Sequence, residues 1–354
     1  MNVTNGKYPF DRPVIILSAP RAGSTLLFET LTKSSDFWTI GGESHAVFEH
    51  INHFNPAMGM CDSNALSGDD ATPEIIAQVR LDFFKQLRNS IGQDFQSNAG
   101  KIDSPPRLLE KTPKNALRVS LLNEIFPDAL FIYLYRNPRE NISSMMDAWQ
   151  SGRFVTYREL AGRDGPWSLL LPPGWQSYND ASLEDVTAFQ WRAANTTILS
   201  ELSKLDRNRW MAVSYEQQTR EPVDTIKKIC EFCDVSPDGI LDFLSGGRLP
   251  LSRYTLTHPA ANKWHKNARA LSKVMSELRE TIDYIRKTAD GLPDAEFDLI
   301  VDPSLTGDTA PTAQAAAAGV DSAFKGGRNE RCHCGSGKRF KHCHGNLGSK
   351  GNSN

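Results

Sequence analysis

The turn at residues 18–23 has the residue types of a phosphate-binding loop. Four apolar residues, Val14 to Leu17, precede it and predict a buried strand, while Ser24 and Thr25 follow it at the start of an apolar-periodic helix. Backbone N–H groups and the positive end of the helix dipole would point at one spot, which suits an anion. The stretch therefore predicts a strand, a glycine-containing turn and a helix that together hold a phosphate-like group.

This loop departs from the Walker pattern G-x-x-x-x-G-K-[ST] of nucleotide-binding loops. It matches at Gly23 and Thr25, whereas Ser18 and Ser24 occupy the positions of the first glycine and the lysine. Its positive charge comes instead from Arg21, inside the turn. We therefore expect the loop to bind a phosphate-like group without the usual combination of lysine and Mg²⁺.

Two other turns carry side chains suited to the same site. Glu43 and His45 follow a short β-prone run at residues 37–40, and ligands of open α/β sheets bind beyond the carboxyl ends of strands. Both side chains are therefore expected to face the crevice of the loop. Arg136 follows the strongest strand pattern of the chain, residues 129–135, and opens a second strand-turn-helix unit with basic groups at its turn.

Strand and helix patterns alternate along the chain, which predicts an α/β fold with a P-loop-type, doubly wound parallel sheet flanked by helices. The expected strands are residues 14–17, 37–40, 108–109, 129–135 and 210–215. The expected helices are residues 25–34, 73–91, 116–126, a segment from about 141, 186–205, 222–233 and 272–287. Residues 46–72 and 150–182 show no clear period, and we expect them to be irregular and to shape the pocket for a substrate.

Composition narrows the class of protein. The 354 residues suggest one large domain with additions, and the net charge of −2 gives no general case for nucleic-acid binding. No run of about 18 apolar residues is present, so no membrane span is expected, and the first residues lack the apolar core of a secretory signal. Three of the six cysteines fall within residues 332–343, which favours a metal site and a reducing, cytoplasmic compartment.

The C-terminal segment predicts a small structural zinc knuckle. The candidate ligands form a tetrahedral Cys₃His set: Cys332, Cys334, Cys343 and His344. The segment resembles the SEC-C motif of the preprotein translocase ATPase, and His344 occupies the usual fourth position; His333 and His342 are the alternatives. So short a segment has almost no core and would need Zn²⁺ to fold.

Three regions follow from these patterns. They are a catalytic domain at residues 1–302, a flexible linker at residues 303–324 and the zinc-binding tail at residues 325–354. Residues 321–354 carry seven Lys and Arg and two Asp and Glu, a net charge of +5. The tail is therefore expected either to dock on an acidic protein or RNA surface or to be a stabilising appendage.

Two motifs resemble those of sulfotransferases. Residues 20–27, PRAGSTLL, resemble the 5′-phosphosulfate loop, which binds 3′-phosphoadenosine-5′-phosphosulfate (PAPS). Residues 135–145, YRNPRENISSM, resemble the 3′-phosphate motif, in which an Arg and a Ser eight residues later hold the 3′-phosphate; Arg136 and Ser144 have that spacing. The resemblance covers roughly residues 12–290 and implies a PAPS-dependent enzyme.

Further residues resemble the tyrosylprotein and carbohydrate branch of that family. GGESH at 41–45 resembles a Gly-Glu-Glu-Thr-Arg segment whose second Glu is the base, which implies Glu43 as the base and places His45 at the family's Arg. Lys111 lies in a segment that resembles the strand end contacting the transferring group. Tyr215 lies in one that resembles the Tyr-Glu-x-Leu contact to the adenine nucleotide.

These resemblances imply an in-line transfer of a sulfuryl group to a hydroxyl or amine acceptor, a small molecule, sugar or peptide. The implied catalytic residues are Glu43, Lys111 and Arg21. The implied donor-binding residues are Arg21, Ala22, Gly23, Ser24, Thr25, Leu26, Arg136, Ser144 and Tyr215.

Structural roles are the alternatives for single residues. Glu43 could cap a helix, Lys111 could pair with a neighbouring carboxylate, and Lys263 could lie in a solvated turn rather than close over a phosphate. Cys230 and Cys233 form a C-x-x-C pair, but their apolar helical surroundings favour burial over redox or metal chemistry. For the whole protein, the alternatives are a P-loop kinase or NTPase, and a non-catalytic adaptor acting through its zinc tail.

Overall fold

The computed structural model describes only part of the chain. The described residues are 9–59, 61–98, 104–245, 249, 251–260 and 262–288. All of them belong to the first of two compact units, Met1–Thr306 and Gly307–Asn354. The predicted linker and zinc tail, including Cys332, Cys334, Cys343 and His344, lie outside the described residues.

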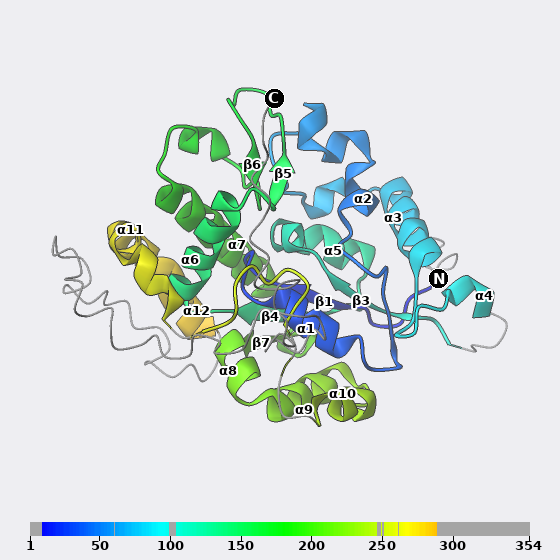
Figure 1. Ribbon diagram of the computed structural model, residues 1–354. Coiled ribbons are helices and arrows are strands. Elements are labelled where there is room, and N and C mark those ends of the chain that lie inside the picture. Colours follow the sequence, from blue (N-terminus) through cyan, green and yellow to red (C-terminus); the bar gives the residue numbers. More distant parts are fainter. Residues whose placement is uncertain are drawn as a thin grey trace, which may run out of the picture. The chain divides into compact units, whose positions relative to one another are not determined.

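A five-stranded parallel sheet forms the centre of the described part (Figure 1). Its order is β2-β3-β1-β4-β7, and every neighbouring pair is parallel. The strands are β1 (Val14–Leu17), β2 (Phe37–Trp38), β3 (Arg107–Lys111), β4 (Leu130–Tyr135) and β7 (Trp210–Ser214). Strand β1 lies in the middle and is fully buried, as its apolar run predicts.

Helices cover both faces of this sheet, so the predicted doubly wound α/β class is confirmed. Figure 1 shows α9 and α10 on one side of the sheet, with α3, α5, α6 and α7 on the other. The helices are α1 (Ser24–Leu31), α2 (His45–Glu49), α3 (Pro73–Gln86), α4 (Phe95–Asn98), α5 (Val119–Ile125), α6 (Pro138–Gln150), α7 (Leu183–Leu202), α8 (Tyr215–Arg220), α9 (Pro222–Cys233), α10 (Asp238–Leu244), α11 (Ala268–Val274) and α12 (Arg279–Thr288).

The side chains of β1 pack into two separate cores, one on each face of the sheet, because successive side chains of a strand point to opposite sides. Ile15 and Leu17 pack with α3, α5, α6 and α7. Val14 and Ile16 pack with α1, α9 and α10. Cys230 and Cys233 lie buried in this second core, where burial raises the pKa of both thiols, so the structural interpretation of the C-x-x-C pair is confirmed.

Three expected helices differ from the structure. The one expected over residues 73–91 ends at Gln86, because Leu87 is extended and Arg88 pairs with Thr39. The other two are interrupted. The segment expected as one helix over residues 116–126 begins with a 3₁₀ turn, Pro113–Leu117, and becomes α5 only after Arg118 (φ −134°) interrupts the regular backbone. The last helix, expected over residues 272–287, is divided into α11 and α12 by another 3₁₀ turn. Apolar periodicity does not distinguish these breaks from a continuous helix.

The long insertion after α6 is more ordered than its sequence suggests. It holds an antiparallel pair, β5 (Val155–Tyr157) and β6 (Trp167–Ser168), and has a small core of its own. That core consists of Tyr157, Leu160, Trp167, Leu171, Trp175, Val186 and Phe189. Residues 46–72, also expected to be irregular, begin within α2 and continue through 3₁₀ turns.

Among the helices of the described residues, none combines the length and apolar character needed to cross a membrane.

Candidate active site

A cavity of about 960 Å³ lies beyond the carboxyl ends of β1, β3, β4 and β7. The turns after these strands, the insertion at residues 153–156 and the segment at residues 251–260 line it. It therefore lies where open α/β sheets bind ligands.

The phosphate loop after β1 adopts two left-handed backbone conformations, at Arg21 (φ 64°) and at Gly23 (φ 103°). Gly23 is the N-cap of α1 and has no side chain to cap the helix. A Cβ atom at this position would lie 2.3 Å from Cδ2 of Tyr215. Glycine is thus required here both for its backbone conformation and for the close approach of the Tyr215 ring.

The backbone donors of the loop are fewer than the sequence suggested. The N–H of Ala22 donates to the Ala19 carbonyl at 3.3 Å, and the N–H of Leu26 donates to the Gly23 carbonyl at 3.0 Å. The donors left for a ligand are those of residues 23–25, at the positive end of α1. Of the donor-binding residues predicted at positions 22–26, residues 23–25 therefore keep a backbone N–H group for a ligand.

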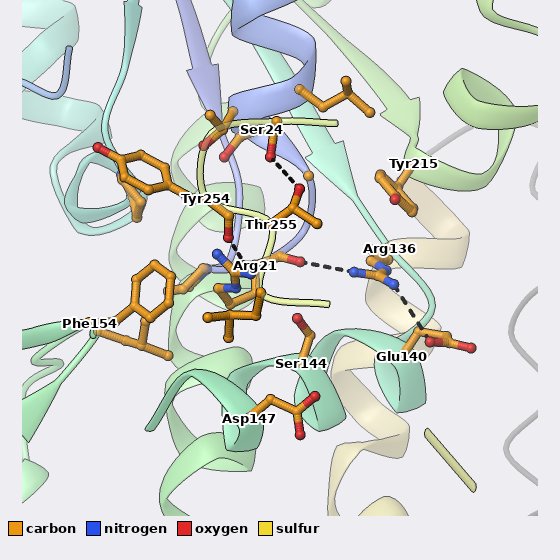
Figure 2. Close-up of a pocket in the computed structure, with 18 of the residues that line it drawn as sticks. Arg21, Ser24, Arg136, Glu140, Ser144, Asp147, Phe154, Tyr215, Tyr254 and Thr255 are labelled. Atoms are coloured by element: carbon orange, nitrogen blue, oxygen red, sulfur yellow. Dashed lines mark hydrogen bonds and ion pairs between the residues drawn. The ribbon is translucent and has the colours of Figure 1, made fainter. Parts of the chain in front are cut away.

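Arg21 extends from the loop into the cavity (Figure 2). Its Nη2 donates to the Tyr254 carbonyl at 3.0 Å, and its guanidinium lies 4.6 Å from the ring centre of Phe154. Burial, and then the charge of nearby Arg136, lower the pKa of Arg21 to about 10. The side chain stays charged at neutral pH, and an anion in the cavity would relieve both effects.

Arg136, at the end of β4, faces the same cavity. Its Nη1 donates to the Arg21 carbonyl at 3.1 Å, and its Nη2 lies 3.6 Å from Oε2 of Glu140. The guanidinium stacks 4.4 Å from the ring centre of Tyr215. Ser144, two turns along α6, lines the cavity with them (Figure 2). The structure thus gathers Arg21, Arg136, Ser144 and Tyr215 around one space.

Lys111 joins the turn containing Glu43 to the phosphate loop. Its Nζ donates to Oε1 of Glu43 at 2.5 Å and to the Thr25 hydroxyl at 3.1 Å. On the other side of the carboxylate, Nε2 of His45 lies 2.8 Å from Oε2 of Glu43. Lys111 is almost fully buried, whereas Glu43 and His45 line the cavity.

The environment of Glu43 strongly favours the ionised carboxylate. Burial alone would raise its pKa, but the hydrogen bond with His45 and the charge and hydrogen bond of Lys111 outweigh burial and lower the pKa to about 2. Glu43 is therefore available to accept a proton at neutral pH, although it is a weak base while Lys111 is bound to it.

A buried hydrogen-bond network, which sequence reasoning missed, anchors this turn to the end of β3. The Ser44 backbone N–H donates to the Thr112 hydroxyl at 2.7 Å, and the Ser44 hydroxyl donates to Oε1 of Glu110 at 2.6 Å. Asn115 donates to the same Glu110 oxygen at 3.0 Å. The signal in the sequence is the set of short polar side chains at two adjacent strand ends.

The segment at residues 251–260, which we name the strap, was also missed as a cavity wall. Arg253 donates to Glu29 on α1 at 2.5 Å and to the Gly41 carbonyl at 3.4 Å. The strap therefore contacts both the helix of the phosphate loop and the turn before Glu43. Lys263 lines the cavity as well, but its Nζ donates to the hydroxyl of Thr257 on the strap.

The profile of the sulfotransferase family matches residues 13–238, almost two thirds of the chain. The chain belongs to the sulfotransferase family, whose general chemistry is sulfuryl transfer. The matched segment contains the whole parallel sheet and every residue that the sequence predicted for catalysis and donor binding.

Two curated relatives match most of this chain. An uncharacterised protein of Aquifex aeolicus is 24% identical over 281 residues, 77% of this chain. The protein-tyrosine sulfotransferase of Drosophila melanogaster is 25% identical over 294 residues, 81% of this chain. The chain spans only 33% of the first relative and 51% of the second.

Among solved structures, the sulfotransferase domain of the curacin biosynthetic pathway is 19% identical, with a TM-score of 0.42. The match covers 74% of this chain and 98% of that domain. At this score the likeness is a general one, so the fold assignment depends on the strand order described above.

The SEC-C motif matches residues 328–346, beyond the described part. The corresponding segment is 53% identical over 49 residues to the SecA subunit of the protein translocase of Pseudomonas fluorescens, covering 14% of this chain and 5% of SecA.

Proposed function

We propose that this chain transfers a sulfuryl group from PAPS to a hydroxyl or amine acceptor. The observation that carries the proposal is the convergence of two guanidinium groups and a lysine-bound carboxylate in one cavity. Arg21 and Arg136 suit the two anionic ends of the donor, and Glu43, which lines the same cavity, suits the acceptance of a proton from the acceptor.

The cavity suits the donor at two positions. Arg21 and the N–H groups of residues 23–25 would hold the phosphosulfate end, because they combine a cation with the start of a helix. Arg136 and Ser144 would hold the 3′-phosphate, and Tyr215 would contact the nucleotide from its place against Gly23. The charge of Arg136, which together with burial lowers the pKa of Arg21, supports an anionic occupant.

Bound PAPS supplies the sulfuryl group; the residues of this chain then orient it and move one proton. Glu43 takes the acceptor's proton as the acceptor oxygen or nitrogen bonds to sulfur and the bond from sulfur to the leaving phosphate oxygen breaks. Lys111 and Arg21 neutralise the charge that grows on the leaving oxygen. As the Lys111 ammonium turns toward that charge, its hold on Glu43 weakens, which raises the pKa of Glu43 and makes it a stronger base.

The test is a transfer assay with ³⁵S-labelled PAPS and a panel of alcohols, sugars and peptides, together with calorimetry of 3′,5′-ADP binding. We expect labelled product and saturable 3′,5′-ADP binding in chelator-treated buffer. Mg²⁺-dependent ATP turnover without 3′,5′-ADP affinity would instead support the kinase or NTPase alternative. Donor binding without transfer to any member of the panel would favour the adaptor alternative.

For the tail, the proposal remains a structural Zn²⁺ bound by Cys332, Cys334, Cys343 and His344. We expect about one Zn²⁺ per chain by elemental analysis, released by a strong chelator, while the affinity for 3′,5′-ADP stays the same. Loss of metal and donor binding together would contradict two independent modules. Docking of the basic tail on RNA or an acidic protein is testable by comparing the full chain with one ending before residue 325.

A further inference from the structure

A second group of charged side chains lies beside Glu43, and the mechanism proposed above does not use it. Glu49 and Lys114 line the cavity, and Tyr157 and Arg118 lie directly behind them. Burying charges in this way is costly unless they are paired or bind something, so the group needs an explanation.

The contacts within the group are one-sided. Oε1 of Glu49 receives the ammonium of Lys114 and the hydroxyl of Tyr157, the latter at 3.0 Å, and lies 3.8 Å from Nη2 of Arg118. All three contacts fall on this one oxygen. Among the residues that the structure describes, Oε2 of Glu49 has no hydrogen-bond partner, although an ionised carboxylate oxygen can accept two hydrogen bonds.

Lys114 also has capacity left. Its ammonium carries three N–H donors, and two of them are used, toward Glu49 and toward the Tyr157 hydroxyl at 3.0 Å. A ligand group at this place could therefore both donate a hydrogen bond, to Glu49, and accept one, from Lys114. A hydroxyl does both, whereas an ammonium only donates and a carboxylate only accepts.

The charges of the group argue for a neutral occupant. Arg118 is fully buried, and its Nη1 and Nη2 have no hydrogen-bond partner among the described residues, so two cations stand against one carboxylate. Burial lowers the pKa of Lys114 to about 8 even though Glu49 opposes that change, which reflects the cost of holding a charge of either sign at this place. The unpartnered oxygen of Glu49 in turn repels an anion.

The position of the group relative to Glu43 follows from α2. His45 and Glu49 are four residues apart on this helix, so they lie on one face, with Cβ atoms about 5–6 Å apart. His45 contacts Glu43 directly. Glu49 therefore lies about one helical turn from His45, the residue that contacts Glu43, and all three line one cavity, so a single small molecule could reach both carboxylates.

We infer that Glu49 and Lys114 bind a second hydroxyl of the acceptor, in the same cavity as the hydroxyl that faces Glu43. This rests on the proposed function and specifies its substrate class: a neutral acceptor with at least two hydroxyl groups, such as a sugar or a cyclic diol. Apolar side chains of the same cavity, among them Val155, Leu169 and Leu170, would pack against the apolar face of such a ring.

The experiment compares matched acceptors that differ by one hydroxyl: cyclohexane-1,4-diol with cyclohexanol, and a methyl hexopyranoside with its monodeoxy analogues. For the wild-type chain we expect kcat/KM for the acceptor with the additional hydroxyl to exceed kcat/KM for the acceptor that lacks it by about 10- to 100-fold. This is the contribution of a hydrogen bond to a charged group. In Glu49→Gln, where an amide NH₂ can replace the accepting oxygen, that ratio should fall toward one. Glu201→Gln changes a partly buried carboxylate of α7 that pairs with Lys204 and does not line this cavity; it is the matched control and should keep the ratio.

A purely structural role for Glu49 predicts something different: both members of each pair would decline together and the ratio would persist, which overturns the inference. Equal kcat/KM values in the wild-type chain, or a preference for 4-aminocyclohexanol over the diol, also overturn it. Calorimetry of each acceptor with 3′,5′-ADP present separates this question from the proposed function. If no transfer occurs, diol binding that depends on Glu49 supports the subsite, and its absence overturns it.

Discussion

The two halves of the cavity treat charge in opposite ways. On the donor side, Arg21 and Arg136 lie close together at the turns after β1 and β4, and burial and the charge of Arg136 lower the pKa of Arg21. On the acceptor side, Glu43 is paired with Lys111, and Glu49 with Lys114. One half has two neighbouring cations that would gain from an anion, whereas in the other half both carboxylates that line the cavity are already paired with a lysine.

This difference indicates how each half would contribute. Cations without full partners gain free energy when an anion arrives, so they supply affinity. Paired buried charges gain little from a further charge, but they hold their hydrogen-bonding atoms in fixed positions, which supplies orientation. Variants of the two halves should therefore fail in different ways, and the following predictions test this division.

The largest effect is expected from the base. Glu43→Gln should lower kcat by about 10²- to 10⁴-fold, the usual contribution of a general base, while 3′,5′-ADP still binds. Steady-state kinetics with labelled PAPS and calorimetry on the same samples measure both. Glu201→Gln is the control. If Glu43→Gln stays fully active, Glu43 is not the general base.

The donor side should instead fail in affinity. Arg136→Ala removes a charge-assisted contact and the stacking on Tyr215, so we expect the Kd for 3′,5′-ADP to rise by about 10- to 100-fold. Arg88→Ala, which removes an exposed ion pair with Asp94, should leave this Kd unchanged. Unchanged affinity for 3′,5′-ADP in Arg136→Ala, or a loss confined to kcat, would contradict the idea that the donor side supplies affinity.

Gly23 in the phosphate loop and Gly41 in the turn before Glu43 form a matched pair of glycines with positive φ. Gly41→Ala introduces a side chain at φ 78° with nothing within 4 Å, and should cost about 1–2 kcal/mol of stability from backbone strain alone. Gly23→Ala adds a clash with Tyr215 to similar strain, so it should cost more and also weaken 3′,5′-ADP binding. Thermal unfolding with and without 3′,5′-ADP distinguishes the two; equal losses would mean that the Tyr215 contact is unimportant.

The smallest effect concerns stability and pH. Folding lowers the pKa of Glu43 to about 2, so the folded state favours its ionised form, and this stabilisation is present near neutral pH and lost as pH falls toward 2. The difference in unfolding free energy between the wild-type chain and Glu43→Gln should therefore lose about half its size between pH 5 and pH 3. Urea unfolding at both pH values measures it, and a constant difference would contradict the paired state of Glu43.

The donor half was accessible from sequence because its residues are fixed by local chemistry. The apolar run at residues 14–17 and the stronger one at 129–135 predict buried strands, and a strand end determines where Arg21 and Arg136 must lie. The positive φ at Gly23 is likewise typical of a glycine that ends a turn before a helix.

The acceptor half was less accessible because its contacts join residues far apart in the chain. Glu49 pairs with Lys114 across 65 positions and with Tyr157 across 108. The insertion that supplies Tyr157 has no period from which its small core could be foreseen. Only the folded chain brings such partners together, so the sequence singled out Glu43, which does line the cavity, but not the group beside it.

The pair of arginines has a practical consequence for anyone who assays or crystallises this protein. A cavity with two facing cations should not stay empty in ordinary buffers, because phosphate and sulfate are small enough to enter and are present at millimolar concentrations. Apparent donor affinity should then depend on the identity of the buffer anion as well as on ionic strength. Measurements in phosphate buffer would underestimate the affinity for the donor, and chloride or acetate salts are the better choice.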